Sequence, residues 1–225
     1  MAVLEAADDL LAERGFAGVT IEGIAARAQV AKQTIYRWWT SKTDILFDAL
    51  AEDAAAYFTA YDGDDLGNDL RHHLRQLAVF LADTDAGAVC RALAGQAQHD
   101  PGVAARFHAE FVTPQRDRDR APFRRAQSRG ELLDTIDVDF AVDQLVGPVY
   151  YRVLVTGQPV PPEFTDALVD QCVAHAARSK ALPGRCTRAP HFSVSSSRLM
   201  AIHSTSNACA TAMIKTPSDA ARVKS

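Results

Sequence analysis

The residues whose chemistry is most readily interpreted fall at seven consecutive positions, 32–38. Six of them carry a positive charge or can donate or accept hydrogen bonds: Lys32, Gln33, Thr34, Tyr36, Arg37 and Trp38. The seventh, Ile35, lies four residues before Trp39, which is the spacing of one helix face. A helix with one buried apolar edge and one polar, cationic face fits a DNA major groove, where base edges present donors and acceptors.

The preceding residues predict the other half of a helix-turn-helix. Thr20 is the expected N-cap of a helix, and a break at Gln29-Val30 separates that helix from a second one beginning at about Lys32. Four apolar residues recur at helical spacing in the first of the two helices: Ile21, Ile24, Ala25 and Ala28. We interpret Trp39 as a core residue, whereas Trp38 is interpreted either as packing or as a contact to the DNA backbone.

Further helices are expected on both sides of this motif. Residues 2–14 carry an apolar stripe and end at Gly15. The sequence from Ser41 to Asp44 matches a capping box, so another helix opens at Ser41. Five later helical patterns, without strand alternation, lie at 66–83, 87–98, 101–129, 138–156 and 162–178. Gly147-Pro148 is expected to kink the fourth of these.

The predicted fold is therefore all-α. It has an N-terminal helix-turn-helix domain (1–44), a helical ligand-binding and dimerisation domain (45–180) and a tail (181–225). Serine and threonine are frequent in the tail, and no periodic apolar stripe continues there, so we expect it to be disordered.

Composition restricts the cellular setting. The chain has 225 residues, 48% of them hydrophobic, and a net charge of −4. It contains no apolar run long enough to span a membrane and begins without a basic leader, so neither a span nor a signal peptide is expected. Its four scattered cysteines favour a reducing compartment, and we expect a cytoplasmic protein.

Two other patterns could suggest binding sites but are not interpreted as such. Cys172 and His175, with Cys186 and His191, have irregular spacing, so no metal site is predicted. The arginine-rich stretch 116–129 could form a second nucleic-acid surface, but its alternation with aspartate favours a solvated helix face crossed by ion pairs.

With these elements in place, the chain resembles the TetR/AcrR family of bacterial transcription regulators. The resemblance rests on Thr34-Ile35-Tyr36-Arg37 followed by Ser41-Lys42, within residues 2–50. Shorter matches continue through the later helices to about residue 178. They are Ala97 to Pro101, Phe107 to Pro114, Arg129 to Leu132 and Leu145 to Arg152.

The resemblance implies roles for the residues of the motif. Tyr36 and Lys42 would contact phosphates, as would Thr20 at a helix N-terminus. Lys32, Gln33 and Thr34 would approach base edges, and Arg37 could pair with guanine. The sequence departs from the family at three points: Gln29 stands where many members have glycine, Ala31 stands where serine is frequent, and the usual arginine-rich arm before the first helix is missing. We interpret the last difference as a truncated start.

The same resemblance implies a ligand pocket and a dimer interface among the later helices. The expected pocket residues are Phe80, Cys90, Phe107, Phe111, Tyr150 and Tyr151. The expected interface uses the last two helices, which in two copies would form a four-helix bundle. Its residues are Phe140, Leu145, Val149, Val153, Leu154, Phe164, Leu168 and Cys172.

The function expected from the sequence is that of a ligand-responsive repressor. It would bind a palindromic operator in double-stranded DNA as a homodimer and respond to an unknown small molecule, with no cofactor, no membrane partner and no enzymatic activity. Within this class, an activator or a regulator without a ligand remains open. Outside it, the alternatives are an all-α enzyme or small-molecule-binding protein with a vestigial helix-turn-helix, and a structural adaptor dimer.

Overall fold

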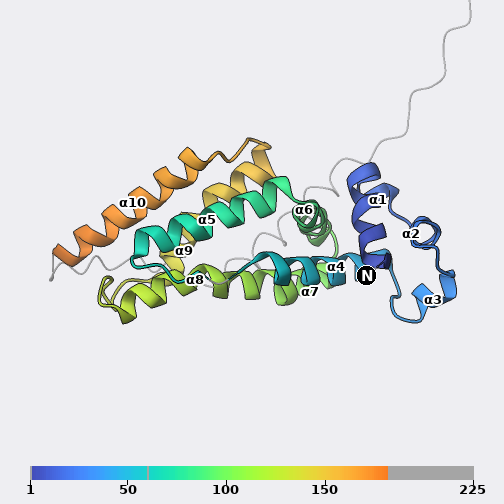
Figure 1. The fold of residues 1–225 in the computed structure, drawn as a ribbon, viewed down its shortest axis with the longest axis horizontal. Helices are drawn as coiled ribbons and strands as arrows, with labels where there is room; N and C mark the ends of the chain where they lie inside the picture. The colour runs from blue at the N-terminus through green and yellow to red at the C-terminus, as the bar shows by residue number, and fades with distance from the viewer. Residues whose placement is uncertain (1, 60, 182–225) are drawn as a thin grey trace, which may run out of the picture. The chain divides into compact units, whose positions relative to one another are not determined.

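A computed structural model describes residues 2–59 and 61–181, with side chains described up to residue 176. Over those residues the chain is helical and contains no strand, which confirms the all-α prediction (Figure 1). The elements are α1 (Ala2–Gly18), α2 (Ile21–Arg27), α3 (Lys32–Tyr36), α4 (Lys42–Tyr57), α5 (Leu66–Asp83), α6 (Asp85–Ala97), α7 (Pro101–Phe107), η1 (His108–Val112), α8 (Thr113–Ser128), α9 (Val138–Tyr150), η2 (Tyr151–Thr156) and α10 (Pro162–Ala181). The tail predicted after residue 181 lies outside the described residues.

Helix α1 contains the break that the sequence predicts at Gly15. Gly15 has φ +65° and ψ 173°, a conformation that glycine adopts without strain, and a separate turn follows it up to Gly18. The helix packs against α2, α4 and α6. Its buried residues are Ala6, Ala7, Leu10 and Leu11.

The turn between α2 and α3 has its tightest point at Gln29. Gln29 has φ +55°, and no other non-glycine residue among those that the structure describes has a positive φ. The amide of Val30 then donates to the carbonyl of Ala25 at 3.0 Å, closing the turn. Ala31 precedes α3 without a side-chain cap. Glycine at position 29 would adopt this positive φ with less strain, and serine at position 31 would supply the missing side-chain cap. Both departures from the family pattern therefore fall at positions where the family residue would favour this backbone.

Helix α3 is only five residues long and depends on tertiary packing, because a helix of this length is not stable alone. Ile35 is fully buried and lies on the side of α3 that packs against α2. The amides of Trp38 and Trp39 both donate to the carbonyl of Ile35 at 2.9 Å, which extends the turn beyond the helix. The start predicted at Lys32 is confirmed.

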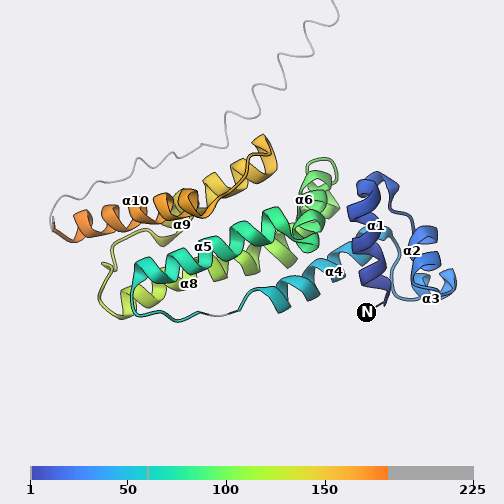
Figure 2. The same cartoon turned by 45° about the horizontal axis from the view of Figure 1, so that its top comes forward.

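Helix α4 leads from the helix-turn-helix to the later helices (Figure 2). It opens with the predicted capping box: Ser41 Oγ accepts from the amide of Asp44 at 3.2 Å, and the Asp44 carboxylate accepts from the amide of Ser41 at 2.8 Å. This cap satisfies amides that have no partner within the helix. Helix α4 packs against α1, α6 and η1.

Helix α5 lies at the centre of the later helices, with α10 along one side and α8 along the other (Figures 1 and 2). It packs against α6, α8 and α10. The alternation of apolar and polar residues at helical spacing explains this position, because its apolar side faces the core. The buried apolar residues of α5 are Leu66, Leu70, Leu74, Leu77, Ala78, Phe80 and Leu81.

Two of the predicted helical stretches are widened into π-turns. The predicted helix 101–129 is continuous but passes through η1, and Pro114 follows in the first turn of α8. Proline has no amide hydrogen to donate to the preceding turn, which favours a local π arrangement. The predicted helix 138–156 continues through Pro148, widens from Tyr151 and ends at Gly157, which has φ +63°.

Candidate nucleic-acid interface

Helix α3 presents a polar face to solvent. Lys32, Gln33, Thr34, Tyr36 and Arg37 are all exposed, and the Tyr36 side chain is among the most exposed aromatic groups of the described chain. Ile35, in the middle of this run, is the buried residue that holds the helix in place. The five polar side chains therefore remain available to an external partner.

The two tryptophans after α3 differ in environment. Trp38 is 71% exposed, and the guanidinium of Arg37 lies 5.9 Å from the centre of its ring. Trp39 is half-buried against the core, and its Nε1 donates to Asp48 Oδ2 at 2.7 Å. Trp39 is therefore structural, as predicted, whereas Trp38 belongs to the exposed surface.

Lys32 is held by an ion pair on the same surface. Its Nζ lies 3.0 Å from Glu22 Oε1, and this hydrogen bond is the main reason that the pKa of Glu22 is lowered. Both side chains are exposed, so the pair contributes little to stability. A DNA phosphate or base edge would therefore compete for Lys32 at modest cost.

The ammonium group of Lys42 is bound to backbone carbonyls of the protein itself. Its Nζ donates to the carbonyls of Phe16 at 2.6 Å and Val19 at 3.0 Å, and it lies 4.2 Å from the centre of the Phe16 ring. Burial lowers the pKa of Lys42. Two of the three ammonium hydrogens thus join the start of α4 to the last turn of α1 and to Val19, which follows it. The sequence predicts the phosphate contact alone and misses this structural role.

Thr20 is the N-cap of α2, as predicted. Its Oγ1 accepts from the amide of Gly23 at 3.0 Å. A hydroxyl that accepts one bond can still donate its hydrogen to a phosphate oxygen. Thr20 is exposed, so this donor is accessible.

Two residues that the sequence prediction omits position this surface. Asp48 accepts the indole hydrogen of Trp39, and Arg106 on α7 contacts both Asp44 and Asp48 on α4, at 2.7 and 3.4 Å. Arg106 also lies 4.3 Å from the centre of the Phe47 ring. No local sequence pattern connects α7 to α4, because the contact depends on how distant helices pack.

Three of the six residues predicted for a ligand pocket lie side by side, because the ring of Phe111 stacks on that of Phe107 and also on that of Phe80, with 6.3 Å between the centres of the latter pair. Phe80, Cys90 and Phe111 are buried in the core, and burial raises the pKa of Cys90 to about 12. Phe107 and Tyr150 are half-buried, and Phe107 stacks on Phe111 with 5.4 Å between ring centres. Tyr151 is 59% exposed and thus separate from the others, because adjacent residues of a helix point in different directions. The two cavities beside α5 described below are lined by other residues.

The residues predicted for a dimer interface divide into two sets. Leu145 and Val149 are buried within the protomer, at 2% and 0% exposed, so they cannot form an interface as the chain stands. Both lie on the side of α9 that packs against α8 and α10. The other six remain accessible to different degrees: Phe140 and Leu154 are exposed, and Val153, Phe164, Leu168 and Cys172 are half-buried.

The arginine-rich helix α8 carries ion pairs, as expected. Arg116 pairs with Asp143 at 2.6 Å, and Arg120 pairs with Asp139 at 2.7 Å. Further along the helix, Arg125 and Arg129 both reach the buried Asp69. This network occupies these arginines and supports the solvated-face interpretation over a second nucleic-acid surface.

Neither a metal site nor a membrane span is found in the part of the chain that the structure describes. No group of three or more His, Cys, Asp or Glu side chains there is arranged to hold a metal ion. Cys186 and His191 fall outside the described residues. No helix among those described is long and apolar enough to cross a membrane.

Comparisons with known proteins match this geometry. Residues 3–49 match the family described as bacterial regulatory proteins, tetR family, and residues 60–172 match the tetracyclin repressor-like C-terminal domain. The helix-turn-helix-type transcriptional regulator YdeS of Bacillus subtilis (strain 168) is 34% identical over 168 residues, covering 75% of this chain and 84% of YdeS. The chain belongs to the TetR family.

Two further TetR-family proteins are similar over most of their length. The DNA-binding transcriptional repressor TetR of Mycobacteroides abscessus is 30% identical over 173 residues, covering 75% of this chain and 88% of that repressor. The crystal structure of the TetR-family transcription regulator SCO0332 superposes with a TM-score of 0.65 at 31% identity, covering 77% of this chain and 95% of SCO0332. As a TetR-family member, the chain is a DNA-binding transcriptional regulator, and the comparisons point to regulators and not to an enzyme family.

Proposed function

We propose that this TetR-family regulator is a repressor that binds a palindromic operator as a homodimer and is released by a small molecule. The observation that carries the proposal is the exposed polar face of α3, held in place by the buried Ile35. The similarity to a repressor of Mycobacteroides abscessus supports repression over activation. A cytoplasmic location follows from the proposed partner, operator DNA.

The two proposed domains have different functions and follow one another along the chain. Residues 1–44 form the DNA-binding domain, and residues 45–180 bind the effector and dimerise without catalysing a reaction. Polar residues lining cavities beside α5 support effector binding, whereas the surface of α3 offers the donors that DNA recognition needs. Effector and operator then communicate through α4, which belongs partly to both domains.

We propose two kinds of DNA contact. Gln33, Thr34 and Arg37, with Lys32 once it leaves Glu22, approach base edges in the major groove. The remaining contacts are to the DNA backbone and come from Thr20, Tyr36, Trp38 and the third hydrogen of the Lys42 ammonium. Each cationic contact to a phosphate should make the slope of log affinity against log salt concentration more negative by about 0.9.

Selection from a random double-stranded DNA library at moderate salt tests this proposal. The wild-type protein should enrich a palindrome, and the Gln33→Ala/Tyr36→Ala variant should enrich nothing. Arg124→Ala, which removes an exposed cation from α8, serves as the control and should select the same sequence. Failure of the folded wild-type protein to enrich any sequence would contradict the proposal and favour a vestigial helix-turn-helix.

The proposed dimer uses the outer side of α9, η2 and α10. Four large apolar side chains are exposed there: Phe140, Tyr151, Leu154 and Val155. Exposed apolar side chains gathered along one element are typical of a protein interface. In this arrangement Leu145 and Val149 support the interface from within the protomer instead of contacting the partner.

Light scattering coupled to size-exclusion chromatography tests the interface. The wild-type protein should have twice the mass of the chain, and Leu154→Asp/Val155→Asp should shift it toward the monomer. Val79→Asp, which changes an exposed apolar residue of α5, should remain dimeric. A monomeric wild-type protein would refute this part of the proposal.

A further inference from the structure

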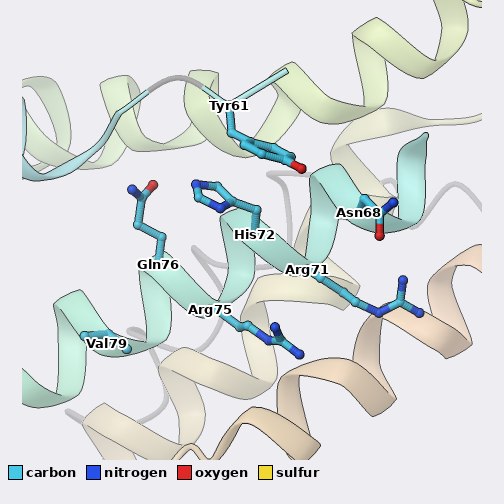
Figure 3. Close-up of a pocket in the computed structure, with 7 residues that line it drawn as sticks. All are labelled: Tyr61, Asn68, Arg71, His72, Arg75, Gln76 and Val79. Atoms are coloured by element: carbon cyan, nitrogen blue, oxygen red, sulfur yellow. The ribbon is translucent and has the colours of Figure 1, made fainter. Parts of the chain in front are cut away.

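Two adjoining hollows lie beside α5. The outer one is an open groove of about 490 Å³ lined by Tyr61, Asn68, Arg71, His72, Arg75, Gln76 and Val79 (Figure 3). The inner one is a cavity of about 180 Å³ between α5, α8 and the segment that follows α4. It is lined by Phe58, Thr59, Tyr61, Asp69, His72, His73, Gln76, Arg118, Ala121, Pro122 and Arg125. The two share Tyr61, His72 and Gln76.

The cations of the outer groove already have partners. Arg75 pairs with Asp166 of α10 at 2.6 Å, and Arg71 pairs with Asp170 of the same helix. Figure 3 shows both arginine side chains directed away from Tyr61 and His72. An anion entering the outer groove would therefore compete with two existing carboxylates.

Arg118 in the inner cavity is different. Its guanidinium is half-buried, and no carboxylate oxygen of a described residue lies within 4 Å of it. One of its five N–H groups donates to Gln115 Oε1 at 3.0 Å, and the group lies 4.9 Å from the centre of the Phe58 ring. Burial lowers the pKa of Arg118, against the weaker attraction of Asp119. A bound anion would replace solvation that this cation loses by burial.

A buried network holds Arg118 in position and occupies the nearest carboxylate. Asp119 Oδ1 lies 2.7 Å from His73 Nε2 and accepts from Gln115 Nε2 at 2.9 Å. Asp119 and Gln115 are both buried, so this arrangement is fixed by packing. The Gln115 amide thus connects Asp119 to Arg118 and leaves the other N–H groups of the guanidinium for a ligand.

Aromatic and other apolar side chains form part of the remaining wall. The Tyr61 ring stacks on His72, with ring centres 4.2 Å apart and planes inclined by 19° (Figure 3). Phe58 and Pro122 complete the apolar lining. A cavity of roughly 150 Å³ is sufficient for a benzene molecule, so the volume here corresponds to one substituted ring.

We propose that the inner cavity binds a single-ring aromatic carboxylate, whose carboxylate pairs with Arg118 while its ring packs against Phe58 and Tyr61. Arg125, the second cation of the lining, pairs with Asp62 at 3.3 Å and Asp69 at 3.4 Å and is not needed for this contact. The inference deepens the proposed function by naming the class of effector. Only the expected effect of the ligand on transcription rests on the proposed function; the binding itself does not.

Calorimetry of the full chain without DNA tests binding directly. The probes are benzoate, salicylate, 4-hydroxybenzoate and phenylacetate, each paired with its uncharged methyl ester. At least one acid should bind the wild-type protein, and its ester should bind about tenfold more weakly or worse, because a charge-assisted pair is lost. Binding of none of the four acids, or equal binding of acid and ester, would overturn the proposal.

Variants locate the site. Arg118→Met should weaken binding of the acid at least about tenfold and leave binding of the ester unchanged. Arg124→Met, on the same helix but exposed, is the matched control and should bind like wild type. If Arg118→Met fails to fold, as judged by its melting transition, Arg118→Lys keeps the charge but loses the planar fork and should bind more weakly than wild type. Unchanged binding by a folded Arg118 variant would refute the assignment.

Operator binding is measured separately, so the two proposals can fail independently. Saturating acid should raise the dissociation constant for the selected operator by about 5-fold to 150-fold if the cavity is the effector site. A protein that binds the acid but selects no DNA would refute the proposed function and not the cavity. A protein that selects an operator but binds no acid would refute the assignment of the cavity and not the proposed function.

Discussion

Arg106 on α7 donates a hydrogen bond of 2.7 Å to Asp44, the residue that completes the capping box of α4. The second oxygen of Asp44 accepts from Thr40 and Ser41, directly after the helix-turn-helix. Although burial acts in the opposite direction, these hydrogen bonds keep the pKa of Asp44 below its usual value. One carboxylate therefore joins α7 to the N-terminus of α4.

Replacing Arg106 by methionine should weaken operator binding although Arg106 lies outside the proposed DNA contacts. The change removes the ion pairs that fix the start of α4, worth about 1 kcal/mol for partly exposed groups, so affinity should fall about fivefold. Fluorescence anisotropy with the selected operator measures the effect. Glu110→Gln, which removes another partner of Arg106 but keeps the bond to Asp44, should bind like wild type.

Lys42→Met should lower both stability and DNA affinity. The carbonyls of Phe16 and Val19 each lose a donor, and the free energy of unfolding should fall by about 1 to 3 kcal/mol. Tyr36→Ala should reduce DNA affinity but change stability by no more than about 0.5 kcal/mol, because Tyr36 is exposed. Urea unfolding of the two variants compares them, and equal stability would show that Lys42 has no structural role.

Gln29→Gly should stabilise the protein. Gln29 adopts φ +55°, which costs a residue with a side chain about 1 kcal/mol relative to glycine. The midpoint of urea unfolding should therefore rise. The matched control is Gln33→Gly, because the same substitution within a helix should destabilise by about 1 kcal/mol. A lower midpoint for Gln29→Gly would contradict the strain argument.

Asp8 should make the folded protein less stable as pH rises. Burial is the largest cause of its raised pKa, which lies at about 7, and the nearby carboxylates of Asp53, Asp85, Asp9 and Glu5 add to it. Its Oδ1 is buried and has no hydrogen-bond partner among the described residues. In the unfolded chain the carboxyl ionises near pH 4, so the folded state binds the extra proton between about pH 4 and 7. The contribution of Asp8 to stability therefore decreases through that range.

The Asp8→Asn variant removes this titration. Its advantage over wild type should be small at pH 4 and larger at pH 8, as measured by urea unfolding at both values. Asp64→Asn, which changes an exposed carboxylate outside this cluster, is the control. If the stability of the Asp8→Asn variant relative to wild type fell between pH 4 and pH 8, the prediction would be wrong.

The sequence predicts well what depends on neighbouring residues. The caps at Thr20 and Ser41, the end of the first helix at Gly15 and the break at Gln29-Val30 are local, because each is set by residues within one turn of the chain. The exposed polar face of α3 follows in the same way from the position of Ile35.

Features that depend on packing between distant helices could not be predicted in this way. Helix α9 is apolar on more than one side, so its sequence does not indicate that Leu145 and Val149 face inward while Phe140 faces outward. The inner cavity is lined largely by polar residues of α5 and α8, such as His72 and Arg118, which a sequence pattern assigns to solvent. The two carbonyl partners of Lys42 come from the segment before α2 and are equally non-local.

The widened turn η1 keeps two helices in register. Arg106 and Arg118 lie over the rings of Phe47 and Phe58, and the arginines are twelve residues apart whereas the phenylalanines are eleven apart. A regular helix turns by about 100° per residue, so the extra residue would rotate Arg118 away from Phe58. A π-turn absorbs one residue, which restores the match. Deleting one residue from η1 would thus convert it into a regular helical turn, bring both spacings to eleven residues and leave both arginines over their rings.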